Sequence, residues 1–184
     1  MPARKTPASS SRANARRPDA IALLKQDHRQ VEEWFEAFEK ARTPDRKLKL
    51  ATQICTALKV HAQIEEEIFY PAFLQEAQDE DIHHEAVVEH DGAKKLIAEI
   101  ESSSPQDDYY DAKVTVLSEM IKHHVKEEEQ RGGMFAEAKS SGMDLQALGE
   151  QLAARKHELM SGMDSDSGTP SRRQAGKSAV RPTA

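Results

Sequence analysis

The chain is short of cysteine, aromatic residues and long apolar runs. Its 184 residues include one cysteine, Cys55, and only 5% aromatic residues. A single cysteine excludes a disulfide within the chain and is consistent with a reducing compartment. No apolar run approaches the roughly 20 residues that span a bilayer, and no apolar block follows the N-terminal arginines, as it would in a secretory signal. We therefore expect a cytoplasmic location.

Acidic residues outnumber basic ones in the middle of the chain. The formal net charge is -6, yet residues 1–19 carry a net +4 and residues 164–184 a net +2. Both ends consist mainly of Ser, Pro, Ala, Arg and Gly, which cannot bury enough apolar surface to fold. We predict disordered basic tails at 1–18 and 161–184 around a folded domain at 19–160. The acidic domain argues against nucleic-acid binding, for which only the tails have the charge.

Strand-like alternation is absent too, and helical periodicity takes its place. Four long segments repeat apolar residues at steps of three and four, which predicts core-facing helices with short connections. Their stripes are Ile21, Leu24, His28, Val31, Phe35 and Phe38; Leu50, Ile54, Ala57, His61, Glu65 and Ile68; His83, Ala86, His90, Ala93, Ile97 and Ile100; Val114, Leu117, Ile121, His124 and Glu128. We predict an all-α, antiparallel up-down-up-down four-helix bundle. A short C-terminal fifth helix, from Asp144 to Leu159, is expected to pack across it.

Capping and helix-breaking residues predict where these helices begin and end. Thr43-Pro44 is expected to begin the second helix and Pro71 to end it. Ser104-Pro105 is expected to begin the fourth helix, and Gly132-Gly133 to end it.

Histidine and glutamate interrupt the apolar stripes of these helices. His61 with Glu65, and His124 with Glu128, are four residues apart and share a helix face. A bundle interior with two carboxylates and four imidazoles, and no Lys or Arg on the same stripes, is costly unless a cation binds there. We predict six metal ligands: His28, His61, Glu65, His90, His124 and Glu128.

The mixture of imidazole and carboxylate donors suits iron, manganese or zinc. If both glutamates bridge two ions, the six side chains supply about eight bonds, and a shared oxide or hydroxide adds two. Two six-coordinate ions need twelve, so about two positions stay open. An open site favours redox chemistry with dioxygen, peroxide or nitric oxide, and zinc has no redox capacity for it.

The order and spacing of these residues resemble the hemerythrin-like, or HHE cation-binding, domain family. The resemblance runs from about residue 20 to 137 and rests on His28, on "HAQIEEEIFYP" at 61–71, on "EHD" at 89–91 and on "HHVKEEE" at 123–129. It implies a four-helix bundle with a non-haem di-iron centre, bridged by two carboxylates and an oxo or hydroxo group. Two iron ions are therefore the expected cofactor.

Two departures bear on the expected activity. Oxygen-carrying hemerythrins have two ligand histidines four residues apart on the third helix, whereas the neighbours of His90 at that spacing are Ala86 and Lys94. Their last carboxylate is an aspartate five residues after its histidine, whereas Glu128 follows His124 by four. With one histidine fewer, a reactive and exchangeable site is expected rather than reversible oxygen carriage.

Several polar residues near the candidate ligands are expected to serve other purposes. Four glutamates are expected to face solvent: Glu66, Glu67, Glu127 and Glu129. His84 and His123 are expected at the surface or around the site, with His123 and Glu127 as a register-shifted alternative pair. Tyr70 is expected to pack as an interfacial aromatic, with a gate or hydrogen-bond donor at the site as its alternative.

The leading functional hypothesis is a di-iron-binding protein that binds or reacts with dioxygen, nitric oxide or peroxide. Whether it turns over a substrate as an enzyme is open, as is its oligomeric state. One alternative is an iron storage or buffering protein without turnover. Another is an interaction module in which metal stiffens the bundle while the last helix or the basic tails bind a partner.

Overall fold

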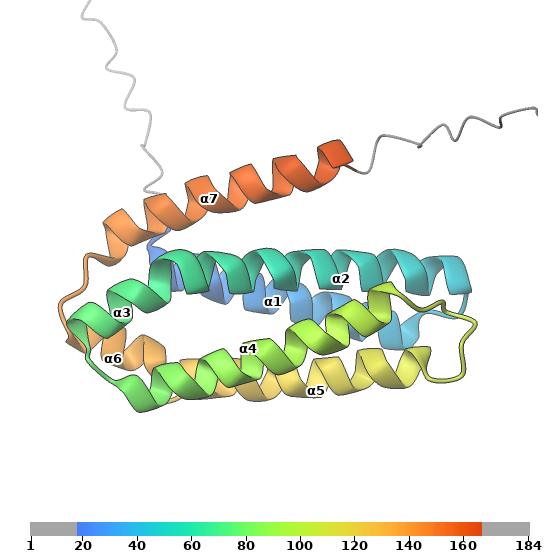
Figure 1. Cartoon of the computed structure of the whole chain (residues 1–184), viewed down its shortest axis with the longest axis horizontal. Coiled ribbons are helices and arrows are strands. Elements are labelled where there is room, and N and C mark those ends of the chain that lie inside the picture. The colour runs from blue at the N-terminus through green and yellow to red at the C-terminus, as the bar shows by residue number, and fades with distance from the viewer. Residues whose placement is uncertain (1–17, 167–184) are drawn as a thin grey trace, which may run out of the picture.

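The computed structural model describes residues 18–166, which fold into helices joined by short turns. Four long helices form the bundle: α1 (Ala20–Lys40), α2 (Pro44–Ile64), α4 (Glu80–Glu101) and α5 (Tyr110–Glu129). Each runs antiparallel to the one before it (Figure 1). The predicted all-α, up-down-up-down bundle is confirmed. The predicted basic tails lie mainly outside the described residues.

Side-chain caps define the beginnings of three long helices. The Asp19 side chain accepts a hydrogen bond from the backbone N–H of Ala22 at α1, and Thr43 caps α2, whose first residue is Pro44. The Asp79 side chain accepts from the N–H of Ile82 at α4. Each cap satisfies one of the donors that a helix N-terminus leaves free. The predicted beginning of the second helix is confirmed.

The prediction that Pro71 ends the second helix is wrong. After α2 the chain makes a π-helical turn, η1 (Glu65–Phe69), and continues as α3 (Tyr70–Glu76). The N–H of Tyr70 bonds to the carbonyl of Glu65, five residues back. Proline lacks an N–H, and its ring clashes with the carbonyl four residues back in a regular helix. A wider turn immediately before Pro71 accommodates it without ending the helix.

The prediction that Ser104-Pro105 begins the fourth helix is also wrong. The Asp107 side chain accepts a hydrogen bond from the N–H of Ser104 at 2.8 Å, which closes a local turn. The helix begins only at Tyr110, whose buried side chain anchors the chain to the core. The predicted break at Gly132-Gly133 is confirmed, because it separates α5 from the short helix α6 (Met134–Ser140).

Two apolar clusters fill the bundle, one on each side of its middle. One contains residues after His28 on α1, before His61 on α2, after His90 on α4 and before His124 on α5, including Phe35. The other gathers the opposite ends of α1, α2 and α4 together with residues of η1, α3, α6 and α7. The four histidines therefore lie in a layer between two apolar clusters.

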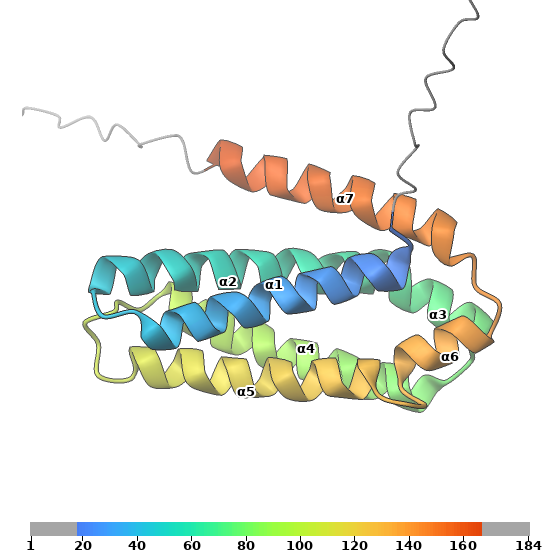
Figure 2. The ribbon, with the colours of Figure 1, turned by 180° about the vertical axis from the view of Figure 1, so that it is seen from behind.

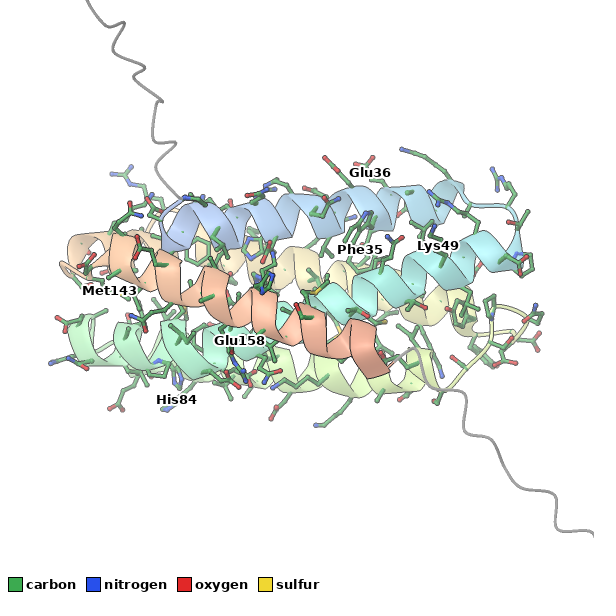
Figure 3. The ribbon with its side chains drawn as sticks, turned by 90° about the horizontal axis from the view of Figure 1, so that it is seen from above. Phe35, Glu36, Lys49, His84, Met143 and Glu158 are labelled. Carbon is green, nitrogen blue, oxygen red and sulfur yellow. The ribbon has the colours of Figure 1, made fainter. Side chains whose placement is uncertain are left out.

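The last helix, α7 (Leu145–Asp166), is longer than the short helix predicted and extends past residue 160. It packs against α1, α2 and η1, and Figures 2 and 3 show it running across that face of the bundle. Gly149 permits this contact, since a Cβ there would lie 2.7 Å from the backbone nitrogen of Ala20. Within residues 18–166 no helix has the combination of length and apolarity that crossing a membrane requires.

Gly149→Ala should lower the free energy of unfolding by about 1–3 kcal/mol, because the new methyl group meets backbone rather than a flexible side chain. Gly162→Ala is the matched control on the same helix, where a Cβ meets nothing within 4 Å. That control should be neutral or stabilising, since alanine favours helix over glycine by about 1 kcal/mol. Urea denaturation of both variants measures the difference, and equal stabilities would contradict the close contact.

Candidate metal centre

The structure brings all six candidate ligands together in the polar layer midway along the bundle. They come from each of the four long helices and from η1: His28, His61, Glu65, His90, His124 and Glu128. All six are buried, and none exposes more than 6% of its surface. Ionisable side chains are almost never this buried unless they are paired or bind a cation.

The four histidines form two close pairs. Nε2 of His28 lies 3.1 Å from Nε2 of His61, and Nε2 of His90 lies 3.2 Å from Nε2 of His124. Each pair therefore directs two imidazole nitrogens toward one point. Convergent nitrogens of this kind are a common way to bind a transition-metal ion.

The two glutamates connect these pairs. Oε2 of Glu65 lies 3.3 Å from Nε2 of His61 and 3.4 Å from Nε2 of His90, so this oxygen touches one imidazole of each pair. The oxygens of Glu128 lie 3.3 and 3.6 Å from the Nε2 atoms of the other two histidines. Each carboxylate thus spans the two histidine pairs. Carboxylates that bridge two cations have this placement.

Both carboxylates lack hydrogen-bond partners. Among the described residues, no donor satisfies either oxygen of Glu65 or of Glu128. An unsatisfied buried carboxylate is expensive, and a bound cation removes that cost. Two groups have the ligand atoms to hold one, within 4.8 Å of one another: His28, His61, Glu65 and Glu128, and Glu65, His90 and His124. The donor set fits metal, and Glu65 belongs to both groups.

A carboxylate lies behind each histidine, on the Nδ1 side of the ring. The Nδ1–oxygen contacts are His28 with Glu129 (2.8 Å), His90 with Glu66 (2.9 Å), His124 with Glu89 (2.8 Å) and His61 with Asp27 (3.5 Å). In the three shorter contacts the carboxylate accepts the Nδ1 proton and leaves the Nε2 lone pair free for a metal. Nδ1 of His61 and the facing Asp27 oxygen have no hydrogen-bond partner among the described residues. The outer carboxylates thus favour the tautomer that directs an Nε2 lone pair into the centre.

The prediction that Glu66 and Glu129 simply face solvent is wrong. Each lies next to a candidate ligand in the sequence and reaches the histidine of a neighbouring helix. Glu67 and Glu127 do face outward, where Glu67 pairs with Arg155 of α7.

A sequence signal for these outer carboxylates exists. Each immediately precedes or follows a candidate ligand: Asp27 beside His28, Glu66 beside Glu65, Glu89 beside His90, and Glu129 beside Glu128. A side chain next to an inward one lies at the flank of the helix, where it faces the adjacent helix. Reasoning from single stripes missed this arrangement because it considers each helix alone.

Basic side chains contact the outer carboxylates in turn. The contacts are Lys25 and Arg29 with Glu129, Lys94 with Glu66, His123 with Glu89, and Lys156 of α7 with Asp27. The lysine and arginine charges fix Glu129, Glu66 and Asp27 and offset part of the negative charge around the centre. One of the five contacts comes from α7, so the last helix contributes to the surroundings of His61.

The remaining histidines lie outside the centre. The His123 side chain is 59% exposed, whereas that of His124 is 5% exposed, so the register-shifted pair of His123 and Glu127 does not face the interior. His84 is exposed, on the outer edge of the bundle (Figure 3).

The expectation that Tyr70 serves only as an interfacial aromatic is wrong. Its side chain is buried, and its hydroxyl oxygen lies 3.2 Å from Nε2 of His90. Residues five apart in a regular α-helix are offset by about 140°, which would direct Tyr70 away from Glu65. The π-helical turn bonds residues five apart and brings Tyr70 back toward the centre.

Comparison with known proteins identifies the family of the chain. The family model described as "Hemerythrin HHE cation binding domain" matches residues 19–132, more than half of the chain. The chain belongs to this family. The match ends before α6 and α7.

Two individual proteins resemble this hemerythrin-like chain. The crystal structure of a hemerythrin HHE cation binding domain-containing protein from Mycobacterium kansasii superposes with a TM-score of 0.72 at 21% identity, over 84% of this chain and 95% of that one. This likeness shows the fold. A protein named DNA nickase from Nostoc is 26% identical over 110 residues, which are 58% of this chain and 30% of that protein.

Charged side chains inside the candidate centre shift one another's pKa values. Burial alone would lower the pKa of His124, but Glu128 and Glu89 raise it to about 9. Burial would raise the pKa of Glu65, but His61 and the other nearby histidines lower it to about 2. At neutral pH the metal-free protein therefore holds a protonated His124 and an ionised Glu65 in the same buried layer. A metal ion has to displace that proton to bind.

The metal-free protein should lose stability as the pH rises from about 6.5 to about 9. A raised histidine pKa stabilises the folded state fully below the unfolded value of 6.5, and this contribution is lost as the pH passes through the folded value. Chemical denaturation at a series of pH values measures the slope, with His124→Gln as the comparison. Stability that stays constant over this range would contradict the coupling, as would an equal slope in the variant.

The three consecutive glutamates at 65–67 should respond differently to replacement by glutamine. Glu65→Gln should abolish tight metal binding, because it removes a shared ligand. Glu66→Gln should weaken it about 10- to 100-fold, as loss of a carboxylate behind a ligand histidine usually does. Glu67→Gln is the control, because Glu67 pairs with Arg155 instead. Competition with a chromophoric chelator ranks the affinities, and equal effects at positions 66 and 67 would contradict the assigned roles.

Proposed function

We propose that this protein holds two iron ions in a non-haem centre and binds or reacts with a small oxidant: dioxygen, nitric oxide or peroxide. The observation that carries the proposal is the pair of buried glutamates, each spanning two histidine pairs with no hydrogen-bond donor on its oxygens within residues 18–166. Two cations, one beside each histidine pair, satisfy both carboxylates at once. A single cation leaves one histidine pair without a partner.

The donor chemistry favours iron over other metals. Imidazole and carboxylate together suit iron, manganese and zinc, whereas magnesium and calcium prefer all-oxygen sites. Six side chains do not fill the coordination of two six-coordinate ions, which leaves room for an exogenous ligand. When bound, a pair of iron ions supplies the redox capacity and open positions that chemistry with dioxygen, nitric oxide or peroxide needs.

The protein's own residues prepare the site for this chemistry. The carboxylates behind the imidazoles fix each ring, and the apolar clusters on either side exclude bulk water. Burial and then the charges of Glu65 and Glu128 raise the pKa of Tyr70 well above its usual range. Tyr70 therefore keeps its proton at neutral pH and can donate it in a hydrogen bond to a ligand beside His90.

One of the cavities next to the centre has room only for a small ligand. A cavity of about 20 Å³ touches His61, His90 and His124 and is otherwise lined mainly by apolar side chains such as Leu58 and Ile97. Its volume is close to the roughly 10–15 Å³ that one water-sized probe requires. A diatomic molecule or peroxide fits this scale, whereas a bulky organic substrate does not.

We do not extend DNA nicking to this chain. The similar segment covers only 30% of the nickase, and the identity is 26%. The described part of the chain is acidic, which disfavours contact with phosphates.

Metal analysis after anaerobic reconstitution with Fe²⁺ should give about two irons per chain, with a near-ultraviolet charge-transfer band after exposure to air. Glu65→Ala and Glu128→Ala should lose most of the iron, because each removes a ligand shared by both ions. Glu67→Ala should keep it. Absence of iron from the reconstituted wild type would contradict the proposal.

Tyr70→Phe separates reactivity from metal binding. The variant should retain its iron but react more slowly with peroxide or release nitric oxide faster, since it lacks the donor beside His90. Stopped-flow absorbance with each oxidant in turn also identifies which one the centre prefers. Wild-type kinetics in this variant would show that the phenol only packs.

A further inference from the structure

A small cavity reaches the centre from the side of α4 and α5. Its volume is about 60 Å³, and it lies against the turn between α5 and α6. Glu89, His124 and Glu128 form its inner part, and Glu85 and Glu127 line it nearer the surface. The cavity thus connects the bundle surface to a candidate bridging ligand.

This cavity differs in charge from the others that touch the centre or its outer carboxylates. Four glutamates and no lysine or arginine line it: Glu85, Glu89, Glu127 and Glu128. The cavity between α1 and α5, of about 340 Å³, is lined by Arg29, Lys122 and Lys126 as well as by glutamates. The three further cavities each include Lys94 or Lys156. Among these cavities of the described residues, this one alone has carboxylates in its lining and neither lysine nor arginine.

Glu128 is a buried carboxylate in the lining of the acidic cavity. It is 2% exposed, lines the inner part of the cavity, and has no hydrogen-bond partner for either oxygen among the described residues. A cation that enters past Glu85 and Glu127 therefore arrives at a carboxylate that lacks a partner. This buried group distinguishes the cavity from an ordinary cluster of surface acids.

Glu85 and Glu127, the two glutamates nearer the surface, make few contacts with the rest of the protein. Glu85 is exposed and has no hydrogen-bond or ion-pair partner within residues 18–166. Glu127 only accepts a hydrogen bond from Gln130 nearby on the same surface. Neither contacts a candidate ligand histidine, unlike Glu89, which holds His124. Both can therefore be replaced without disturbing the centre.

We propose that Glu85 and Glu127 form the loading port through which divalent cations such as Fe²⁺ reach Glu128 and the metal centre. This inference rests on the proposed metal-binding function and adds the route. Uncompensated charge in a cleft raises the local concentration of an oppositely charged ligand and its association rate by about 10- to 1000-fold. The effect weakens as ionic strength rises, because salt screens exposed charges. The port should thus change the rate of loading and leave the final occupancy unchanged.

Stopped-flow loading of the metal-free protein with Co²⁺, followed by its visible absorbance, tests the port directly. The double variant Glu85→Gln/Glu127→Gln should load at least about fivefold more slowly than wild type at low ionic strength. The difference between the two loading rates should decrease in high salt, and the final Co²⁺ content of the variant should match that of the wild type. The matched control Glu39→Gln/Glu150→Gln removes two exposed acids elsewhere on the bundle and should load at the wild-type rate.

The outcomes separate the port from the function on which it rests. Loading of the double variant at the rate of the control, with normal final occupancy, would overturn the port alone. A reduced final Co²⁺ content in a double variant that still folds, as judged by circular dichroism, would overturn it too, because Glu85 and Glu127 would then be ligands. A wild-type protein that takes up no Co²⁺ and no Fe²⁺ would overturn the proposed function.

Discussion

Two glutamate carboxylates without hydrogen-bond donors, in the middle of a helix bundle, are the constraint on which the rest of the structure depends. Glu65 and Glu128 are 0% and 2% exposed, and four imidazoles are their nearest polar neighbours. Burying such charge costs several kcal/mol per ion unless a counter-charge compensates it. The protonated His124 of the metal-free protein does so in part, and metal ions would do so more completely.

The bundle around this layer keeps it fixed. Apolar clusters on both sides hold the four long helices at a spacing where side chains of each helix reach the next. Acidic residues beside four of the six candidate ligands each contact a histidine of the neighbouring helix, and Lys156 extends this arrangement to α7. The same residues that orient the imidazoles also cross-link the helices, so the fold and the candidate centre depend on each other. The cavity between α4 and α5 is lined by glutamates without lysine or arginine, whereas basic side chains also line the cavity between α1 and α5. The charge around the centre is therefore asymmetric.

The helical periodicity was enough to predict the bundle and to predict which six side chains converge. Two residues four apart on an apolar stripe share one helix face, and that face packs toward the bundle interior. That these six bind metal stays a prediction. Helix ends were predicted less well: Pro71 is accommodated by a π-helical turn that no stripe pattern indicates, and this turn redirects Tyr70. The partners of Glu66 and Glu129 lie on other helices, so only tertiary packing reveals them.

Anomalous diffraction from crystals of the iron-loaded protein, measured at the iron absorption edge, tests the central claim most directly. Two peaks of comparable height are expected, one beside His28 and His61 and the other beside His90 and His124, with Glu65 and Glu128 in contact with both. A single peak, or peaks outside this layer, would contradict the account of two buried carboxylates shared between two ions.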